Sequence, residues 1–178
     1  MKNNGLNERA GFREVRASFR RGLPPRQLGL GLVIGLLAGL AAQAAVRVWD
    51  GSQNGYWSQR LNWNGDVAPQ AGDDLVFPAG ASRPVNTNDL TGTVFRSVTF
   101  TGSNYVLRGL GGRLRLTGGI SAQYSAGTST VALPVQLLAT QRWECVRAGA
   151  VLDMTGDLDL GAFTLTGQGA GQIRLGGS

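Results

Sequence analysis

A five-residue motif recurs along the chain: an apolar residue, any residue, a second apolar residue, Thr and Gly. In each copy two apolar side chains stand two residues apart, so they lie on one face of a strand, and a β-branched residue and a turn-forming residue follow. The pattern predicts short strands that end at glycine and stack as the rungs of a solenoid. The copies are 98–102, 114–118, 152–156 and 163–167, with a variant at 173–177.

Alternation of apolar and polar positions dominates residues 94–178, and no apolar stripe of helical period follows residue 46. We expect almost no helix there and an all-β fold. The spacing of the copies is irregular, so a β-sandwich with glycine turns stays open as the alternative to a solenoid. The predicted strands are 46–49, 74–77, 94–101, 104–108, 113–117, 129–138, 141–147, 150–154, 157–160, 162–166 and 172–175. The side chains predicted to point inward are Leu116, Leu133, Leu152, Leu165 and Leu175.

The region 45–93 has a different composition, rich in Trp, Asn and Gly, and its last part, 81–93, is predicted to be a polar connector. Its tryptophans, Trp49, Trp57 and Trp63, are candidate glycan contacts because aromatic faces stack on sugar rings. They can equally close the open end of a solenoid, where a terminal rung has no neighbour on one side. We favour this second interpretation and treat 45–93 as an N-terminal cap.

The first 44 residues have the order of an export signal. A basic segment, 1–27, precedes an apolar segment, 28–40, and the small residues Ala42 and Ala44 suit cleavage before Ala45. An uncleaved helical anchor that contacts the membrane through residues 28–46 is the alternative, because its length can span a bilayer. The partner implied by a signal is the export machinery, and the protein is then secreted or held at the cell surface.

Most of the formal charge of +6 belongs to this leader. Residues 1–44 hold seven Lys or Arg and two acidic residues, whereas 45–178 hold ten Arg and nine acidic residues. The net charge of the second part is therefore only +1 (10 − 9), which gives no reason to expect a nucleic-acid partner.

The chemistry-bearing residues are few. The chain has no histidine, so Ser-His and Cys-His catalysis are excluded, and acid–base work would fall to carboxylates. Asp153, Asp157 and Asp159 could bind Ca²⁺ if they share one sheet face, but a solvated polar face explains them as well. Asp73 and Asp74 are typical of a turn that enters a strand. We predict no catalytic residue, no metal ligand and no cofactor.

The single cysteine, Cys145, alternates with Glu144 and Val146 in a predicted strand. It shares the face of Trp143, so we expect a buried, unreactive thiol rather than an intermolecular disulfide.

One family has a comparable order of motifs: Trp49-Asp50-Gly51, then 56–58 (YWS), 62–65 (NWNG), 72–77 (GDDLVF), 95–100 (FRSVTF), 116–120 (LTGGI) and 141–143 (QRW). The region from about residue 47 to 178 resembles the N-terminal part of bacterial autotransporter-associated β-strand repeat proteins. The resemblance implies a right-handed parallel β-helix, a passenger exposed at the cell surface or released. Members of that family continue to a barrel or sorting anchor, so we expect 94–178 to be a truncated repeat region.

The resemblance and the missing catalytic residues together favour an exported, non-enzymatic scaffold for surface display or adhesion, whose partner is a cell-surface glycan or a host or abiotic surface. The first alternative is a carbohydrate-binding module that uses the tryptophans. The second is a polysaccharide lyase or hydrolase of β-helix type.

Overall fold

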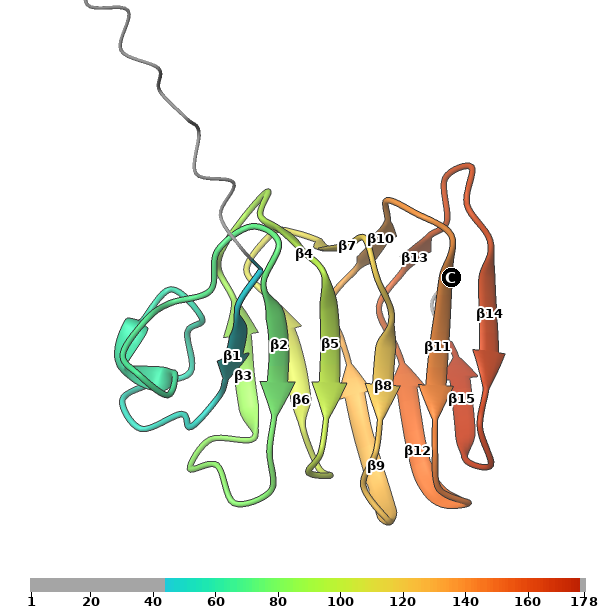
Figure 1. Cartoon of the computed structure of the whole chain (residues 1–178), viewed down its shortest axis with the longest axis horizontal. Helices are drawn as coiled ribbons and strands as arrows, with labels where there is room; N and C mark the ends of the chain where they lie inside the picture. The colour runs from blue at the N-terminus through green and yellow to red at the C-terminus, as the bar shows by residue number, and fades with distance from the viewer. Residues whose placement is uncertain (1–43, 177–178) are drawn as a thin grey trace, which may run out of the picture. The chain divides into compact units, whose positions relative to one another are not determined.

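The structure is a computed structural model that describes residues 44–176. Fifteen strands in this range coil into a β-solenoid of about four turns, with one short 3₁₀ turn, η1, at Arg60–Asn62 (Figure 1). The all-β prediction is confirmed. The helical signal or anchor predicted before it falls on residues outside the described range.

Three sheets surround the core, and every strand pair in them is parallel. After the first two strands, which share one sheet, consecutive strands along the chain belong to different sheets, and each strand hydrogen-bonds to its counterpart in a neighbouring turn. The β-sandwich alternative is therefore wrong, because its sheets would be antiparallel.

The front sheet consists of β1 (Val46–Val48), β2 (Asp74–Phe77), β5 (Ser97–Phe100), β8 (Ile120–Ala122), β11 (Gln141–Cys145) and β14 (Leu165–Gln168). The rear sheet consists of β3 (Val85–Asn88), β6 (Val106–Gly109), β9 (Ala126–Val131), β12 (Gly149–Met154) and β15 (Gln172–Leu175). The short sheet consists of β4 (Val94–Phe95), β7 (Leu114–Leu116), β10 (Val135–Leu137) and β13 (Leu158–Asp159).

One continuous apolar core runs along the inside of the coil. Its side chains form columns along the coil axis, because parallel strands in register place equivalent side chains of successive turns next to one another. Phe77 pairs with Phe100 in this way, and their rings stack with centroids 5.4 Å apart. Burying such columns supplies the main driving force for the coil, at roughly 25 cal/mol per Å² of apolar surface.

The inward leucines were predicted correctly at Leu116, Leu133 and Leu152, which are at most 1% exposed. Leu165 is only half-buried, and the prediction for Leu175 is wrong because this side chain is 58% exposed. Both belong to the last rung. Within the described residues no further rung covers them.

The predicted strand boundaries were wrong where the chain turns from one sheet to the next. Strands whose inward residues are polar or small were not predicted. The expected strand 94–101 is divided between β4 and β5, and 129–138 is divided between β9 and β10, because the chain changes sheet within each. The expected connector 81–93 contains β3, and β8 was not predicted at all. Both β2 and β3 hydrogen-bond into the coil, so 45–93 supplies part of its first full turn.

Candidate functional site

The three tryptophans of the N-terminal region lie together inside the molecule. Trp49, Trp57 and Trp63 are each 0% exposed. Trp63 makes edge-to-face contacts with both of the others, at centroid distances of 5.1 and 6.1 Å, and all three pack on Phe77. In this arrangement no indole face is open for a sugar ring to stack on.

Each indole N–H also has a partner, as buried tryptophans require. Trp49 donates to the Arg83 carbonyl at 2.8 Å, and Trp63 donates to the Trp57 carbonyl at 2.9 Å. Trp57 donates to Oδ1 of Asn86 at 2.7 Å, and Asn86 is itself 1% exposed. The rings are thus fixed by packing and by directional bonds at once.

The loop that carries them, residues 49–72, is called the tryptophan loop below, and its folding depends on the buried amide of Asn62. Its Oδ1 accepts from the backbone N–H groups of Gln53 and Asn54, at 2.9 and 3.0 Å. Its Nδ2 donates to Oδ1 of Asn54 and to the Tyr56 carbonyl, both at 2.8 Å. One side chain therefore satisfies three backbone groups of an irregular segment.

The tryptophan loop also pairs with the first strand edges of all three sheets. At β1, Asn64 N–H donates to the Val48 carbonyl at 2.8 Å, and Trp49, directly after this strand, bridges antiparallel to Trp63. On β3, Thr87 exchanges hydrogen bonds with Gly55 and Trp57.

On β4, Gly72 N–H donates to the Val94 carbonyl at 2.8 Å. Figure 1 shows the tryptophan loop at the end of the coil beside β1 and β3.

Asp73 and Asp74 lie at the entry to β2, as predicted. Asp73 is 2% exposed and accepts hydrogen bonds from Nε of Arg47 at 2.7 Å and from the N–H groups of Ala45 and Gln70 at 2.9 Å. Burial by itself raises the pKa of this carboxyl, but these donors and the Arg47 charge outweigh it, and the pKa is lowered overall.

Asp74 accepts from Arg96 and from the Ser97 hydroxyl, which lower its pKa although burial opposes the shift. Both carboxylates are thus engaged in holding strands.

The structure does not bring the three later carboxylates together. Asp153 is in β12 of the rear sheet, Asp157 precedes β13, and Asp159 ends β13 in the short sheet, where it pairs with Arg113 at 2.8 Å. Within residues 44–176 no three His, Cys, Asp or Glu side chains are grouped to hold a metal ion. The Ca²⁺ interpretation therefore has no geometric basis in that range.

Cys145 is buried in the core, with its thiol 3.3 Å from the Ala150 carbonyl. Burial raises the pKa of this thiol, which keeps it protonated and weakly nucleophilic. Its position on the same inward face as Trp143 agrees with the prediction.

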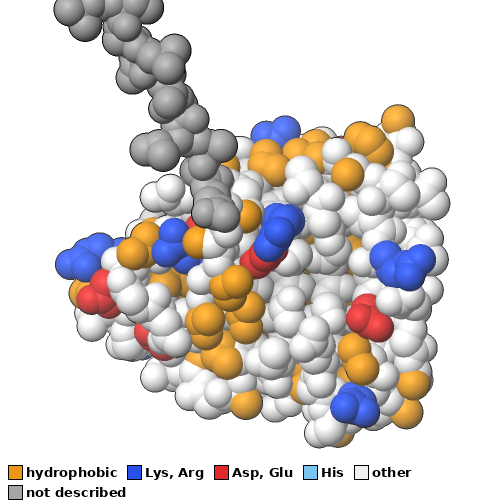
Figure 2. Space-filling view, viewed as in Figure 1, with side chains coloured by type: hydrophobic (Ala, Val, Ile, Leu, Met, Phe, Trp, Pro, Cys, Tyr) orange, Lys and Arg blue, Asp and Glu red, His pale blue; other side chains and the backbone are white. Residues whose placement is uncertain are grey.

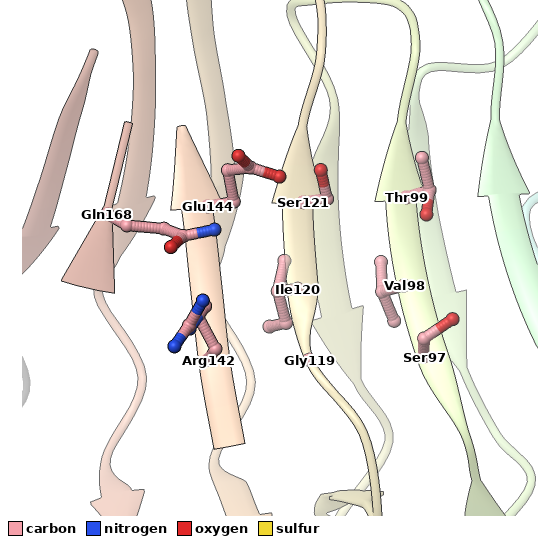
Figure 3. Close-up of a pocket in the computed structure, with 9 residues that line it drawn as sticks. All are labelled: Ser97, Val98, Thr99, Gly119, Ile120, Ser121, Arg142, Glu144 and Gln168. Carbon is pink, nitrogen blue, oxygen red and sulfur yellow. The ribbon is translucent and has the colours of Figure 1, made fainter. Parts of the chain in front are cut away.

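A shallow groove lies away from these residues, on the outer face of the front sheet. Its volume is about 270 Å³, and its polar lining comes from β5, β8, β11 and β14 (Figure 3). The lining side chains are Ser97, Thr99, Ser121, Arg142, Glu144 and Gln168, with Gly119 and the backbone of Val98 and Ile120 between them.

Sequence reasoning missed this groove. The alternation of Arg142 and Glu144 about the buried Trp143 indicated that both point outward, but the neighbours of these side chains depend on the strand register.

A second hollow lies at the last rung. It has a volume of about 280 Å³ and apolar walls, because Gly167 faces Trp143 in the register and supplies no side chain above it. The other lining residues are Leu158, Leu160, Leu165, Ile173 and Leu175.

Compared with known proteins, the chain matches no family model, no curated protein and no solved structure. Among residues 44–176 no helix is long and apolar enough to cross a membrane. The resemblance to autotransporter repeat proteins therefore stays a prediction from the motifs, and function has to be argued from the geometry.

Proposed function

We propose that this protein is an exported, non-enzymatic scaffold of the autotransporter-passenger type, which presents its outer faces at the cell surface for display or adhesion. The observation that carries the proposal is the stack of rungs around one apolar core, with a buried aromatic cluster at its first turn. Such a stack is rigid, and its outward side chains vary without disturbing the core. It thus suits a surface that presents contacts.

The buried polar groups support a scaffold over an enzyme. Three buried polar side chains, Asn62, Asp73 and Asn86, bind backbone groups or neighbouring side chains and so hold the first turn together. A catalytic carboxyl needs its acid–base capacity available, whereas the buried carboxyl of Asp73 is already bonded to Arg47 and to two backbone N–H groups.

The role of the tryptophan loop in this proposal is to close the first end of the coil. It covers apolar side chains and pairs the strand edges at that end, as a capping repeat must. This use of Trp49, Trp57 and Trp63 takes the place of glycan contact.

The proposed coil is right-handed. In Figure 1 the strands of the front sheet run downward, those of the rear sheet run upward, and successive rungs advance from left to right, which supports that sense. Parallel crossover connections also have a strong preference for it.

Export depends on residues 1–44, and this part is tested in cells. We expect the chain, made in a Gram-negative host, to leave the cytoplasm and to begin at Ala45 when sequenced from its N-terminus. Placing arginine in the apolar segment (Val33→Arg with Leu36→Arg) should retain it inside, whereas the matched change Val33→Leu should not. Retention of unmodified chain in the cytoplasm, equal in all three, would overturn the proposal, and an intact Met1 in the membrane fraction would favour the anchor.

A further inference from the structure

We propose that the groove on the front sheet binds a neutral oligosaccharide, whose pyranose units lie along the coil axis across successive rungs. This inference goes beyond the scaffold role and does not depend on export. The groove residues (Figure 3) do not include Trp49, Trp57 or Trp63, which are buried.

The first support is a row of polar side chains in register. Thr99 pairs with Ser121, Ser121 pairs with Glu144, and Glu144 pairs with Gln168. One polar group from each of four rungs therefore lies in line, repeating at the strand separation of about 4.8 Å. This repeat is close to the length of a pyranose unit, so consecutive sugars can meet consecutive rungs.

The second support is the hollow itself. Its floor is β8 with the residue before it, because Gly119 has no side chain and Ser121 has a small one, while Arg142 and Glu144 project from β11 beside it. A Cβ on Gly119 would lie 2.1 Å from the Arg142 carbonyl oxygen, so no larger residue fits there. Figure 2 shows that the middle of this face is mostly backbone and uncharged polar groups.

The chemistry of the lining selects the ligand class. Sugar hydroxyls both donate and accept hydrogen bonds, and the groove offers a guanidinium, a carboxylate, a carboxamide and the hydroxyls of Thr99 and Ser121, which together do both. The Ser97 hydroxyl is already bonded to Asp74. The charges of the groove, Arg142 and Glu144, have opposite sign. They give no net attraction for a charged polymer, and Glu144 opposes an acidic one.

Some charged side chains of the coil are already engaged in ion pairs. Arg47, Arg96 and Arg113 are each paired with an aspartate. Within residues 44–176 neither Arg142 nor Glu144 forms an ion pair, and Arg142 is exposed. Their hydrogen-bonding capacity is therefore available to a ligand.

The test is a titration of the full chain, kept in a sugar-free zwitterionic detergent, with cellohexaose, maltohexaose and hexagalacturonate, followed by amide chemical shifts. We expect saturable shifts at Thr99, Ser121 and Glu144 with at least one neutral hexasaccharide, and at least tenfold weaker binding of the acidic one. Ser121→Trp should fill the groove and abolish the shifts. Thr130→Trp, at an outward position of the rear sheet, is the matched control and should leave them unchanged.

Two milder variants keep the test decisive if Ser121→Trp fails to fold. Arg142→Gln and Glu144→Gln should each weaken the neutral ligand about tenfold, equivalent to about 1.4 kcal/mol for one charged hydrogen bond. Glu144→Gln should also reduce the discrimination against hexagalacturonate. The proposal is overturned if no neutral probe gives saturable shifts, if Ser121→Trp folds and binds normally, or if both milder variants bind normally. Export is measured separately, so either proposal can fail alone.

Discussion

The two ends of the described coil differ in how they cover the apolar core and the strand edges. At the first end the tryptophan loop pairs with the edges of β1, β3 and β4 and places three fully buried indoles over the core. At the last end β13, β14 and β15 each have a strand partner on one side only, within the described residues. An apolar hollow and the exposed side chain of Leu175 lie there.

The difference teaches what closing a solenoid requires. An apolar lid alone would leave strand-edge N–H and C=O groups without partners, and such edges template further pairing. The first end supplies both elements in one loop, with Asn62 and Asn86 completing the hydrogen bonds. Within residues 44–176 the last rung has neither element, so its described residues bury less surface.

The largest expected effect on stability comes from removing an aromatic side chain of the tryptophan loop. Trp63→Ala should lower the free energy of unfolding by about 3–5 kcal/mol, because the side chain is fully buried between two other indoles and Phe77. Urea unfolding followed by circular dichroism measures it. Unchanged stability, with loss of retention on a polysaccharide column, would contradict the lid and favour sugar binding by the tryptophans.

A pair of leucine substitutions compares the middle of the coil with the open end. Leu152→Ala should cost about 2–5 kcal/mol, because Leu152 is 0% exposed. Leu175→Ala should cost at most about 0.5 kcal/mol, since 58% of this side chain is already in solvent. Equal losses in the same urea titration would show that a further layer covers the last rung.

A smaller loss of stability is expected when a hydrogen-bonding side chain of the tryptophan loop is removed. Asn62→Ala leaves the N–H groups of Gln53 and Asn54 and the Tyr56 carbonyl without their partner, which should cost about 1–3 kcal/mol. Asn64→Ala, an exposed position in the same loop, is the control and should change stability by about 0.5 kcal/mol or less. A loss no larger than that of the control would mean that packing alone holds the loop.

The smallest effect is a dependence on pH. The folded-state pKa of Asp73 is depressed, so its contribution is present above the unfolded value of about 3.9 and is lost as pH falls through the lower folded value. Stability should decline below about pH 4, and Asp73→Asn should make this decline shallower. An unchanged acid profile in that variant, by urea midpoint against pH, would contradict the assignment.

The sequence predicted the features that depend on apolar alternation. The inward positions of Leu116 and Leu152 and the all-β class follow from it directly. It failed at β3, whose inward residues are the buried amides Asn86 and Asn88, and at the last rung, where burial depends on a neighbouring rung.

The groove on the front sheet could not be predicted from the sequence, for a related reason. Glu144 meets Ser121 and Gln168 only through the register between turns, which alternation within one strand does not specify.

The most direct test of the difference between the two ends is amide hydrogen exchange, read residue by residue on the full chain. We predict that the loop amides of Trp57 and Asn64, bonded to β3 and β1, exchange as slowly as those of β5 in the coil interior. The amides of β14 and β15 should exchange faster by at least tenfold. Rapid exchange throughout the tryptophan loop, equal to that of β14 and β15, would contradict the account that this loop closes the first end of the coil, whereas the last rung is uncovered within residues 44–176.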